Sequence, residues 1–370
     1  MRIKVSRENL ISGIQTVQNI VSSRSTLPIL SNILIEAKTD ILKLNTTDLD
    51  VGISCEIPVN VYEDGGITIP AKRFNDIIRE LPAGDITITG KKNNQIDIEG
   101  ENCRFKLMGL PREEFPKFPE FKDSEIIHLE QSVFKEMLQL TSFAVSHEET
   151  RYILSGVLIQ IKEDNVRMVA TDGRRLAKID KKVVGHPPRE AAKQYSDGIE
   201  VIIPHKAIVE ISRNLKETGQ VSLIPGTNQI LFNIDSVLIA TRIIEGEFPN
   251  YEQVIPLEVS PKIKVKPQDL LASIRRANLL ATPDFQAIKF EVFPNKLVVS
   301  KSTPDVGESR EELPIEYGGP ELMVGFNPQF FIDLLKNINQ EIIELELVGP
   351  DKPAVIRLPD YLYLALPMRI

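Results

Sequence analysis

Residues 67–81 read ITIPAKRFNDIIREL, which is a short alternating strand followed by an amphipathic helix. The same transition occurs at residues 201–215, VIIPHKAIVEISRNL, and at residues 323–335, MVGFNPQFFIDLL. Each copy has a proline at the junction between strand and helix, where a missing backbone N–H costs little. Three copies of one strand-to-helix unit predict a repeated domain.

A second shared unit precedes each of these copies. Residues 3–38, 127–162 and 263–292 each read as a strand, a helix with apolar residues at three- and four-residue spacing, and another strand. Short alternating strands with hairpin turns then complete each third of the chain. The pattern predicts an α+β fold of three repeated domains, each with two helices packed on antiparallel sheet. The expected domains are residues 1–121, 122–250 and 251–370.

The composition points to an acidic globular protein in a reducing compartment. The 370 residues include 44 Lys and Arg and 52 Asp and Glu, and the formal net charge of −8 argues against a uniformly basic nucleic-acid coat. Cys55 and Cys103 are too few for a disulfide framework, and they lack the CxxC spacing of a zinc site. The N-terminus is charged, and no apolar run approaches the roughly 18 residues of a membrane span. We therefore expect a cytoplasmic protein without a membrane partner.

The charge is unevenly distributed between the expected helices and the rest of the chain. The helices carry a combined formal charge of +3, and the strands and loops −11, when helices are placed at residues 7–21, 72–81, 132–145, 205–217, 267–280 and 327–338. If all these helices faced one surface, it would suit phosphates, whose contacts carry no sequence information. The alternative is a set of solvated helix faces with local ion pairs, such as Lys206 with Glu210. Charge alone favours this alternative.

A search for catalytic, metal-binding and cofactor-binding patterns finds none. The four histidines are scattered, and His147 beside Glu148 and Glu149 lacks the second histidine or spaced carboxylates of a metal site. The sequence has no GxxxxGKS/T, GxGxxG or GxSxG motif. We therefore expect no catalytic residue, metal or cofactor, and a binding function. A nucleic-acid-processing enzyme with an unrecognised site, or a multidomain scaffold, is the alternative.

Two segments are candidates for a binding surface. Residues 169–176, VATDGRRL, end a strand, turn at an Asp-Gly pair and resume a strand. The turn would present Arg174 and Arg175 beside an apolar hollow, and an ordinary hairpin is the alternative. Residues 364–370, LALPMRI, are mostly apolar where chain ends usually fray. We expect this terminal segment to dock in a groove or to form its wall.

Several short segments, in order along the chain, are shared with one known family. They are TLPIL at 26–30, TTDL at 46–49, RY at 151–152, VATDGRRLA at 169–177, FPNY at 248–251, VGFN at 324–327 and LPMRI at 366–370. Through them the chain resembles the bacterial DNA polymerase III beta subunit family, the sliding clamps, along essentially its whole length. The resemblance implies that two subunits close head to tail into a ring of six similar domains. Helices would line the hole around duplex DNA, and the acidic sheets would form the outside.

The resemblance also implies what the protein does and with which partners. A sliding clamp is a non-catalytic processivity factor that tethers the replicative polymerase and other proteins to DNA. The expected partners are double-stranded DNA without sequence preference, the DNA polymerase III alpha subunit, the clamp loader, other polymerases and repair proteins with clamp-binding peptides, and a second copy of this chain.

Three sets of site residues follow from the resemblance, position by position. Those expected to contact DNA are Arg24, Lys72, Arg73, Arg151, Tyr152 and Lys206. Those expected to form a groove for partner peptides are Leu154, Thr171, Gly173, Arg174, Arg175, Leu176, Pro249, Val254, Leu364, Leu366, Pro367, Met368 and Arg369. Those expected at the subunit interface are Phe105 of one subunit and Leu279 and Leu280 of the other. Burial in the core of their own domain is the alternative for the two leucines.

Overall fold

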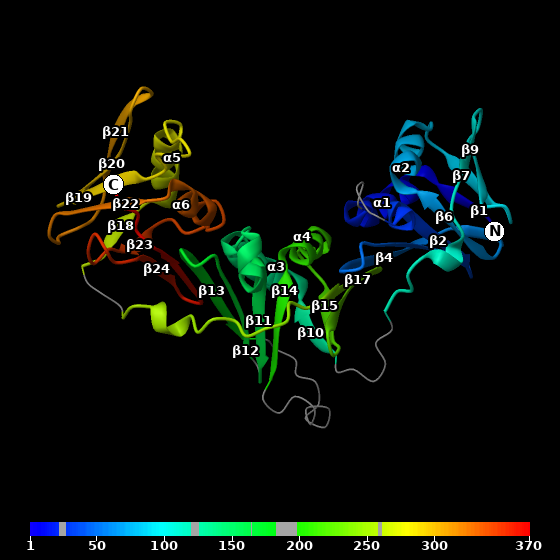
Figure 1. The fold of residues 1–370 in the computed structure, drawn as a ribbon, viewed down its shortest axis with the longest axis horizontal. Helices are drawn as coiled ribbons and strands as arrows, with labels where there is room; N and C mark the ends of the chain where they lie inside the picture. Colours follow the sequence, from blue (N-terminus) through cyan, green and yellow to red (C-terminus); the bar gives the residue numbers. More distant parts are fainter. Residues whose placement is uncertain (22–26, 120–125, 164, 183–197, 258–260) are drawn as a thin grey trace. The chain divides into compact units, whose positions relative to one another are not determined.

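The computed structural model describes residues 1–21, 27–119, 126–163, 165–182, 198–257 and 261–370. Its described residues fall into two compact units, drawn as ribbons in Figure 1. Unit 1 contains residues 1–134 and 206–243, and unit 2 contains residues 135–205 and 244–370, apart from the gaps in these ranges. The middle third of the chain therefore contributes strands to both units.

Unit 1 contains two antiparallel sheets. The first has the order β5 (Asn60–Glu63), β1 (Arg2–Ser6), β7 (Asp85–Gly90), β8 (Gln95–Glu99) and β9 (Arg104–Met108). The second has the order β10 (Ile127–Glu130), β15 (Gln220–Pro225), β16 (Gln229–Ile234), β17 (Val237–Arg242), β4 (Val51–Pro58), β3 (Ile41–Thr47), β2 (Asn32–Lys38) and β6 (Gly65–Pro70). The β17–β4 pair joins the strands of the first and middle thirds into one sheet.

Helices α1 (Arg7–Val17) and α2 (Ala71–Glu80) lie beside each other in unit 1 (Figure 1). Ser6 begins α1, because its side chain accepts a hydrogen bond from the backbone N–H of Asn9. The helix packs closely on the second sheet: a Cβ atom on Gly13 would lie only 2.5 Å from Leu44 Cδ1. The apolar face predicted for this helix is therefore the face that covers the sheet. Helix α4 (His205–Asn214) begins at His205, which belongs to unit 2, and its other residues belong to unit 1.

Unit 2 repeats this arrangement of two antiparallel sheets. The larger sheet has the order β14 (Ile199–Pro204), β11 (Gly156–Lys162), β12 (Asn165–Thr171), β13 (Arg175–Lys182), β25 (Tyr361–Ala365), β24 (Ala354–Leu358), β23 (Ile343–Glu346) and β18 (Ile263–Val265). The smaller has the order β21 (Gly307–Pro314), β20 (Lys296–Thr303), β19 (Ile288–Phe293) and β22 (Leu322–Phe326). The β13–β25 pair is the counterpart of β17–β4, since it joins the middle third to the last third.

Helices α5 (Pro267–Asn278) and α6 (Pro328–Leu335) pack against each other in unit 2 (Figure 1). Helix α3 (Gln131–Thr141) begins in unit 1 and ends in unit 2. All six helices thus form where the sequence predicts them, and the predicted α+β class is confirmed. The expected helix at residues 7–21 is too long, because the chain tightens into a 3-10 turn at Gln18–Ile20 and is extended at Val21. The helices expected at residues 132–145, 205–217 and 327–338 also end earlier, at Thr141, Asn214 and Leu335. Within the described residues, no helix is long and apolar enough to cross a membrane.

Candidate functional site

The turn after β12 is held in shape by hydrogen bonds within its own five residues. The carboxylate of Asp172 accepts from the backbone N–H groups of Arg174 at 2.8 Å and Arg175 at 3.0 Å. The Thr171 hydroxyl accepts from Gly173 N at 3.0 Å and donates to Arg175 O at 2.6 Å. Gly173 has φ +83°, a conformation that a glycine adopts without steric cost. The Asp-Gly pair therefore forms the predicted tight turn, and hydrogen bonds stabilise it on both sides of Gly173.

The side chain of Arg175 points into unit 2 and anchors this turn. It is 8% exposed and forms ion pairs with Asp172 at 3.0 Å and Asp333 at 2.7 Å. Its Nη2 donates to the backbone oxygen of Phe143 at 2.6 Å, and its guanidinium lies 4.9 Å from the ring centre of Phe330. These contacts satisfy a planar, permanently charged group. The guanidinium thus holds the turn against α6 and the segment after α3.

Beneath the turn, an apolar cluster joins residues that are distant in the sequence. Leu176 and Leu364 lie in one buried cluster with Phe248 and Tyr251, and Leu154 packs against it. Leu366 N also donates to Arg174 O at 2.8 Å. Five of the predicted groove residues, from three separate segments of the chain, are therefore close together or connected by backbone hydrogen bonds.

The C-terminal segment is docked along unit 2. Met368 N donates to Gly325 O at 2.8 Å, which extends the sheet that contains β22. Of the predicted groove residues, Val254 and Leu366 are 55% and 39% exposed, and Arg174, Pro249 and Arg369 are also exposed. Pro367 and Met368 are partly buried. The segment is therefore an ordered edge that keeps apolar side chains accessible.

Two tyrosines fix β25 under the segment. Burial raises the pKa of Tyr361 and of Tyr363, so both phenols stay protonated and donate hydrogen bonds. Tyr361 donates to Leu140 O at 3.0 Å, and Tyr363 donates to Phe330 O at 2.8 Å. These residues were not singled out from the sequence, because they alternate with Leu362 and Leu364 and the strand shows no polar face.

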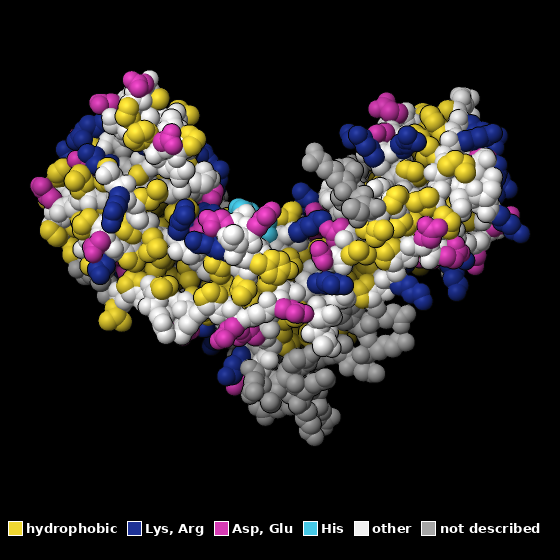
Figure 2. Space-filling model, in the orientation of Figure 1, with side chains coloured by type: hydrophobic (Ala, Val, Ile, Leu, Met, Phe, Trp, Pro, Cys, Tyr) yellow, Lys and Arg dark blue, Asp and Glu magenta, His cyan; other side chains and the backbone are white. Residues whose placement is uncertain are grey.

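The predicted DNA-contacting residues differ in whether their charged groups form ion pairs within the protein. Lys72 and Arg73 are exposed on the first turn of α2, and neither has an acidic partner among the described residues. Lys206 is half-exposed but forms an ion pair with Asp48. Figure 2 shows Lys and Arg side chains over α2 with acidic side chains next to them. The predicted Arg24 lies outside the described residues.

Arg151 and Tyr152 lie in a 3-10 segment of unit 2, Glu149–Ser155. Arg151 pairs with Glu148 at 3.1 Å and donates to the backbone oxygen of Asp172 at 2.5 Å. Its guanidinium thus supports the same turn that Arg175 anchors. Tyr152 is 63% exposed, which leaves its ring accessible to a ligand.

The residues predicted at the subunit interface are accessible in their separate units. Phe105 is 37% exposed on β9, which is the last strand of its sheet in the described part of the chain. Met108, on the same strand, is 61% exposed and was not singled out from the sequence. Leu279 is 81% exposed just after α5, so burial in its own core is excluded for this side chain. Exposed apolar side chains on an edge strand are typical of a contact surface.

Models of three domains of one family match nearly the whole chain. They describe the N-terminal, central and C-terminal domains of the DNA polymerase III beta subunit, and they match residues 1–119, 128–250 and 252–369. The beta sliding clamp of Chlamydia muridarum is 33% identical over 100% of this chain and 99% of its own length. That of Pseudomonas putida is 30% identical, with full coverage of both chains.

Solved structures agree with these sequence matches. The DNA polymerase sliding clamp of Bacillus subtilis has a TM-score of 0.93 at 29% identity, covering 100% of this chain and 99% of its own. The sliding clamp of Bartonella birtlesii, solved bound to griselimycin, has a TM-score of 0.92 at 31% identity with full coverage of both chains. The likeness extends over both compact units.

Proposed function

The chain belongs to the DNA polymerase III beta subunit family, and we propose that it is a DNA sliding clamp. It encircles duplex DNA and tethers the replicative polymerase to it, which confers processivity without catalysis. The observation that carries this function is the full-length match to relatives named beta sliding clamp. A clamp held by topology needs only weak phosphate contacts, which suits the modest charge of +3 on the helices as the sequence predicts them. We further propose a cytoplasmic location.

We propose that the three domains extend over residues 1–121, 122–250 and 251–370, and that two chains close head to tail into a ring. Phe105 of one subunit would contact Leu279 and Leu280 of the other. The support is the exposure of Phe105 and Leu279 and the place of β9 at the edge of its sheet. A heterologous contact of this kind closes into a ring only when the rotation between neighbouring subunits fits the number of subunits.

We propose that the DNA contacts come from Lys72, Arg73, Tyr152 and Lys206, with Arg24 and Arg151 also near the backbone of the duplex. Lys72 and Arg73 have the strongest support because they are exposed and have no acidic partner among the described residues. Binding of Lys206 to phosphate would compete with its ion pair to Asp48. Contacts of this type are independent of base sequence.

We propose that the surface around the Thr171–Arg175 turn accepts short peptides from the DNA polymerase III alpha subunit, the clamp loader and other partners. Leu366 and Val254 would contact the apolar side chains of a peptide, and the buried Leu176 and Leu364 would support them. The hydroxyl of Thr171 and the guanidinium of Arg175 already bind groups within the protein. These two residues would therefore set the shape of the turn. Gly173, Arg174, Pro249, Pro367, Met368 and Arg369 would form the rim.

Retention on closed DNA tests the proposed function. The full-length protein is loaded onto a nicked circular plasmid with the cognate clamp loader, separated from free protein, and then treated with a restriction enzyme. We expect the protein to remain on the circle and to be lost after linearisation, and to be kept when the linear ends are blocked. Salt-sensitive binding that is the same on circular and linear DNA would contradict the ring.

A further inference from the structure

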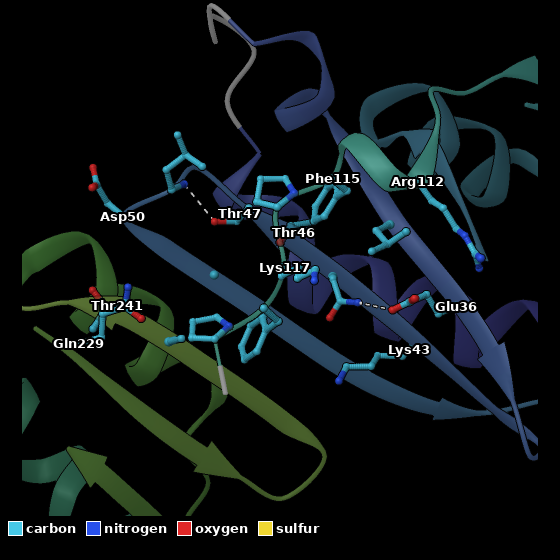
Figure 3. A pocket seen from close by; sticks show the side chains of 18 of the residues that line it. Glu36, Lys43, Thr46, Thr47, Asp50, Arg112, Phe115, Lys117, Gln229 and Thr241 are labelled. Atoms are coloured by element: carbon cyan, nitrogen blue, oxygen red, sulfur yellow. Dashed lines mark hydrogen bonds between the residues drawn. The ribbon is translucent and has the colours of Figure 1, made fainter. Parts of the chain in front are cut away.

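A cavity of about 550 Å³ lies in unit 1, and its lining includes none of the residues proposed above for DNA, peptide or subunit contacts. Its wall is formed by β2, β3, the start of β4, the ends of β16 and β17, and the segment at residues 115–119. Figure 3 shows Glu36 and Lys43 on the strands and Phe115 and Lys117 on the segment that crosses them. Cavities of this size are typical of ligand sites.

The turn at this cavity repeats the geometry of the Thr171–Arg175 turn. The carboxylate of Asp48 accepts from the backbone N–H groups of Asp50 at 3.0 Å and Val51 at 2.8 Å. The Thr47 hydroxyl accepts from Leu49 N at 3.0 Å and donates to Val51 O at 3.1 Å. Leu49 has φ +82°, almost the value of Gly173, although a leucine is strained in this region.

The neighbouring strand repeats the pattern as well. Arg242 N donates to Asp50 O at 2.9 Å, just as Leu366 N donates to Arg174 O at 2.8 Å. The cavity therefore occupies, in unit 1, the place equivalent to the proposed peptide groove of unit 2. This equivalence rests on the repeated backbone and holds whether or not the groove in unit 2 binds peptides.

The cavity exists in unit 1 because three apolar side chains of unit 2 have smaller or polar counterparts there. The strand registers pair Leu34 with Asn45 and Leu158 with Val169, so Asn45 stands where unit 2 has Val169. By the same register, Gly52 stands in place of Leu176, and Ala240 in place of Leu364. Those three apolar residues fill the buried cluster of unit 2. Their counterparts leave room under the crossing segment, although the ring of Phe118 lies over Gly52, 3.4 Å from where a Cβ atom would stand.

Asn45 is a buried polar residue in the wall of this cavity. It is 4% exposed, and its Nδ2 donates to Glu36 Oε2 at 3.4 Å, the dashed bond beside Glu36 in Figure 3. That bond sets the orientation of the amide, and Oδ1 has no partner in the described structure. Buried acceptors are almost always paired. This unpaired oxygen is covered by protein atoms, so it marks the wall of the cavity as imperfectly packed.

The charges around the cavity favour an acidic ligand. Lys43, Lys117 and Arg242 line it, and among the described residues none of them forms an ion pair. Lys43 instead lies 5.9 Å from the ring centre of Phe118. The other basic residue, Arg112, is already paired with Glu113 at 3.1 Å. The carboxylates that remain, Glu36 and Asp50, leave an excess of positive charge for a ligand.

We propose that this cavity is a second peptide-binding site, which takes a short extended segment with a carboxylate side chain next to an apolar one. The carboxylate would bind Lys43, Lys117 or Arg242, and the apolar side chain would contact Leu34 and Phe118. A free small anion would leave both the apolar wall and most of the volume unused. The site goes beyond the proposed function, because it would let one subunit hold two different partners.

A displayed library of random octapeptides, selected on the full-length protein, tests this proposal. We expect one class of selected peptides with Asp or Glu beside an apolar residue. Its affinity should fall at least about tenfold, ~1.4 kcal/mol, with Lys43→Ala and with Gly52→Leu, whose side chain would displace the Phe118 ring and occupy the cavity. Met368→Ala should leave this class unchanged, and so should the control Lys92→Ala, which removes an exposed lysine away from the cavity.

Three results would overturn the proposal. They are a selection that yields no such class, a class whose affinity survives Gly52→Leu, and succinate binding at the cavity without any peptide class. Thermal unfolding checks that the Gly52→Leu protein is folded. If it is not, Asn45→Val is used in its place, because this variant introduces the residue that unit 2 has at position 169. Peptides that respond only to Met368→Ala test the groove of unit 2. Failure of one site is therefore distinguishable from failure of the other.

Discussion

Replacement of Arg175 by alanine tests the idea that this residue supports the turn from within. The substitution removes ion pairs to Asp172 and Asp333 and a hydrogen bond to Phe143 O. Each charge-assisted hydrogen bond contributes about 1.5–3 kcal/mol. The two carboxylates left behind are 16% and 19% exposed, so water can solvate them in part. We expect a net loss of about 3–5 kcal/mol in the free energy of unfolding of unit 2.

Urea unfolding followed by far-ultraviolet circular dichroism measures this loss, because the chain has no tryptophan to report by fluorescence. Hydrogen exchange should localise it, with faster exchange in β13 and α6 and unchanged exchange in β7 and β8. The control is Arg174→Ala, whose side chain is 62% exposed and whose loss should cost under about 0.5 kcal/mol. A loss below about 1 kcal/mol for Arg175→Ala would refute the reasoning, because the network would then contribute no more than a surface ion pair.

Three further predictions concern the other proposed surfaces and pH. Phe105→Asp should convert the dimer into a chain of 41.6 kDa in sedimentation equilibrium; an unchanged mass would remove Phe105 from the interface. Replacing Lys72 and Arg73 by alanine should reduce the slope of log affinity against log salt on short duplex DNA by about 2, and an equal slope would exclude phosphate contacts. Burial and the nearby His147 lower the pKa of His205 below 6.5, so folding stability should fall as pH drops through and below that value. His205→Gln should reduce this fall between pH 7.5 and 5.5 in urea unfolding, and an identical fall in both proteins would contradict the assignment.

The repeat and the elements were readable in the sequence because their signals are local. Residues 67–81 and 201–215 became strand β6 with helix α2 and strand β14 with helix α4. The end of α1 was less predictable, since the residues after Val17 keep an apolar pattern while the backbone tightens. Helix ends depend on capping contacts that apolar spacing does not encode.

The roles of individual charged residues were not readable in the same way. The sequence places Arg174 and Arg175 side by side in a turn, yet one is exposed and the other is buried. The difference depends on Asp333, 158 residues away from Arg175. Leu279 shows the reverse case, because an apolar residue after an amphipathic helix proved to be exposed. Burial is set by which segments meet, and spacing along the chain does not contain that information.

The sequence by itself determined the threefold α+β repeat and the six helices, because periodicity and turn residues act over a few neighbouring positions. The family followed from the short segments that the chain shares with it. Tertiary structure alone decided that β4 pairs with β17 and β13 with β25, so that the middle third of the chain is shared by two units. It also decided that Asn45, Gly52 and Ala240 leave a charged cavity at the place where apolar residues fill unit 2. The physical reason is that strand register sets residues distant in the chain against one another. Only their combined volume and charge determine whether a space is filled or open.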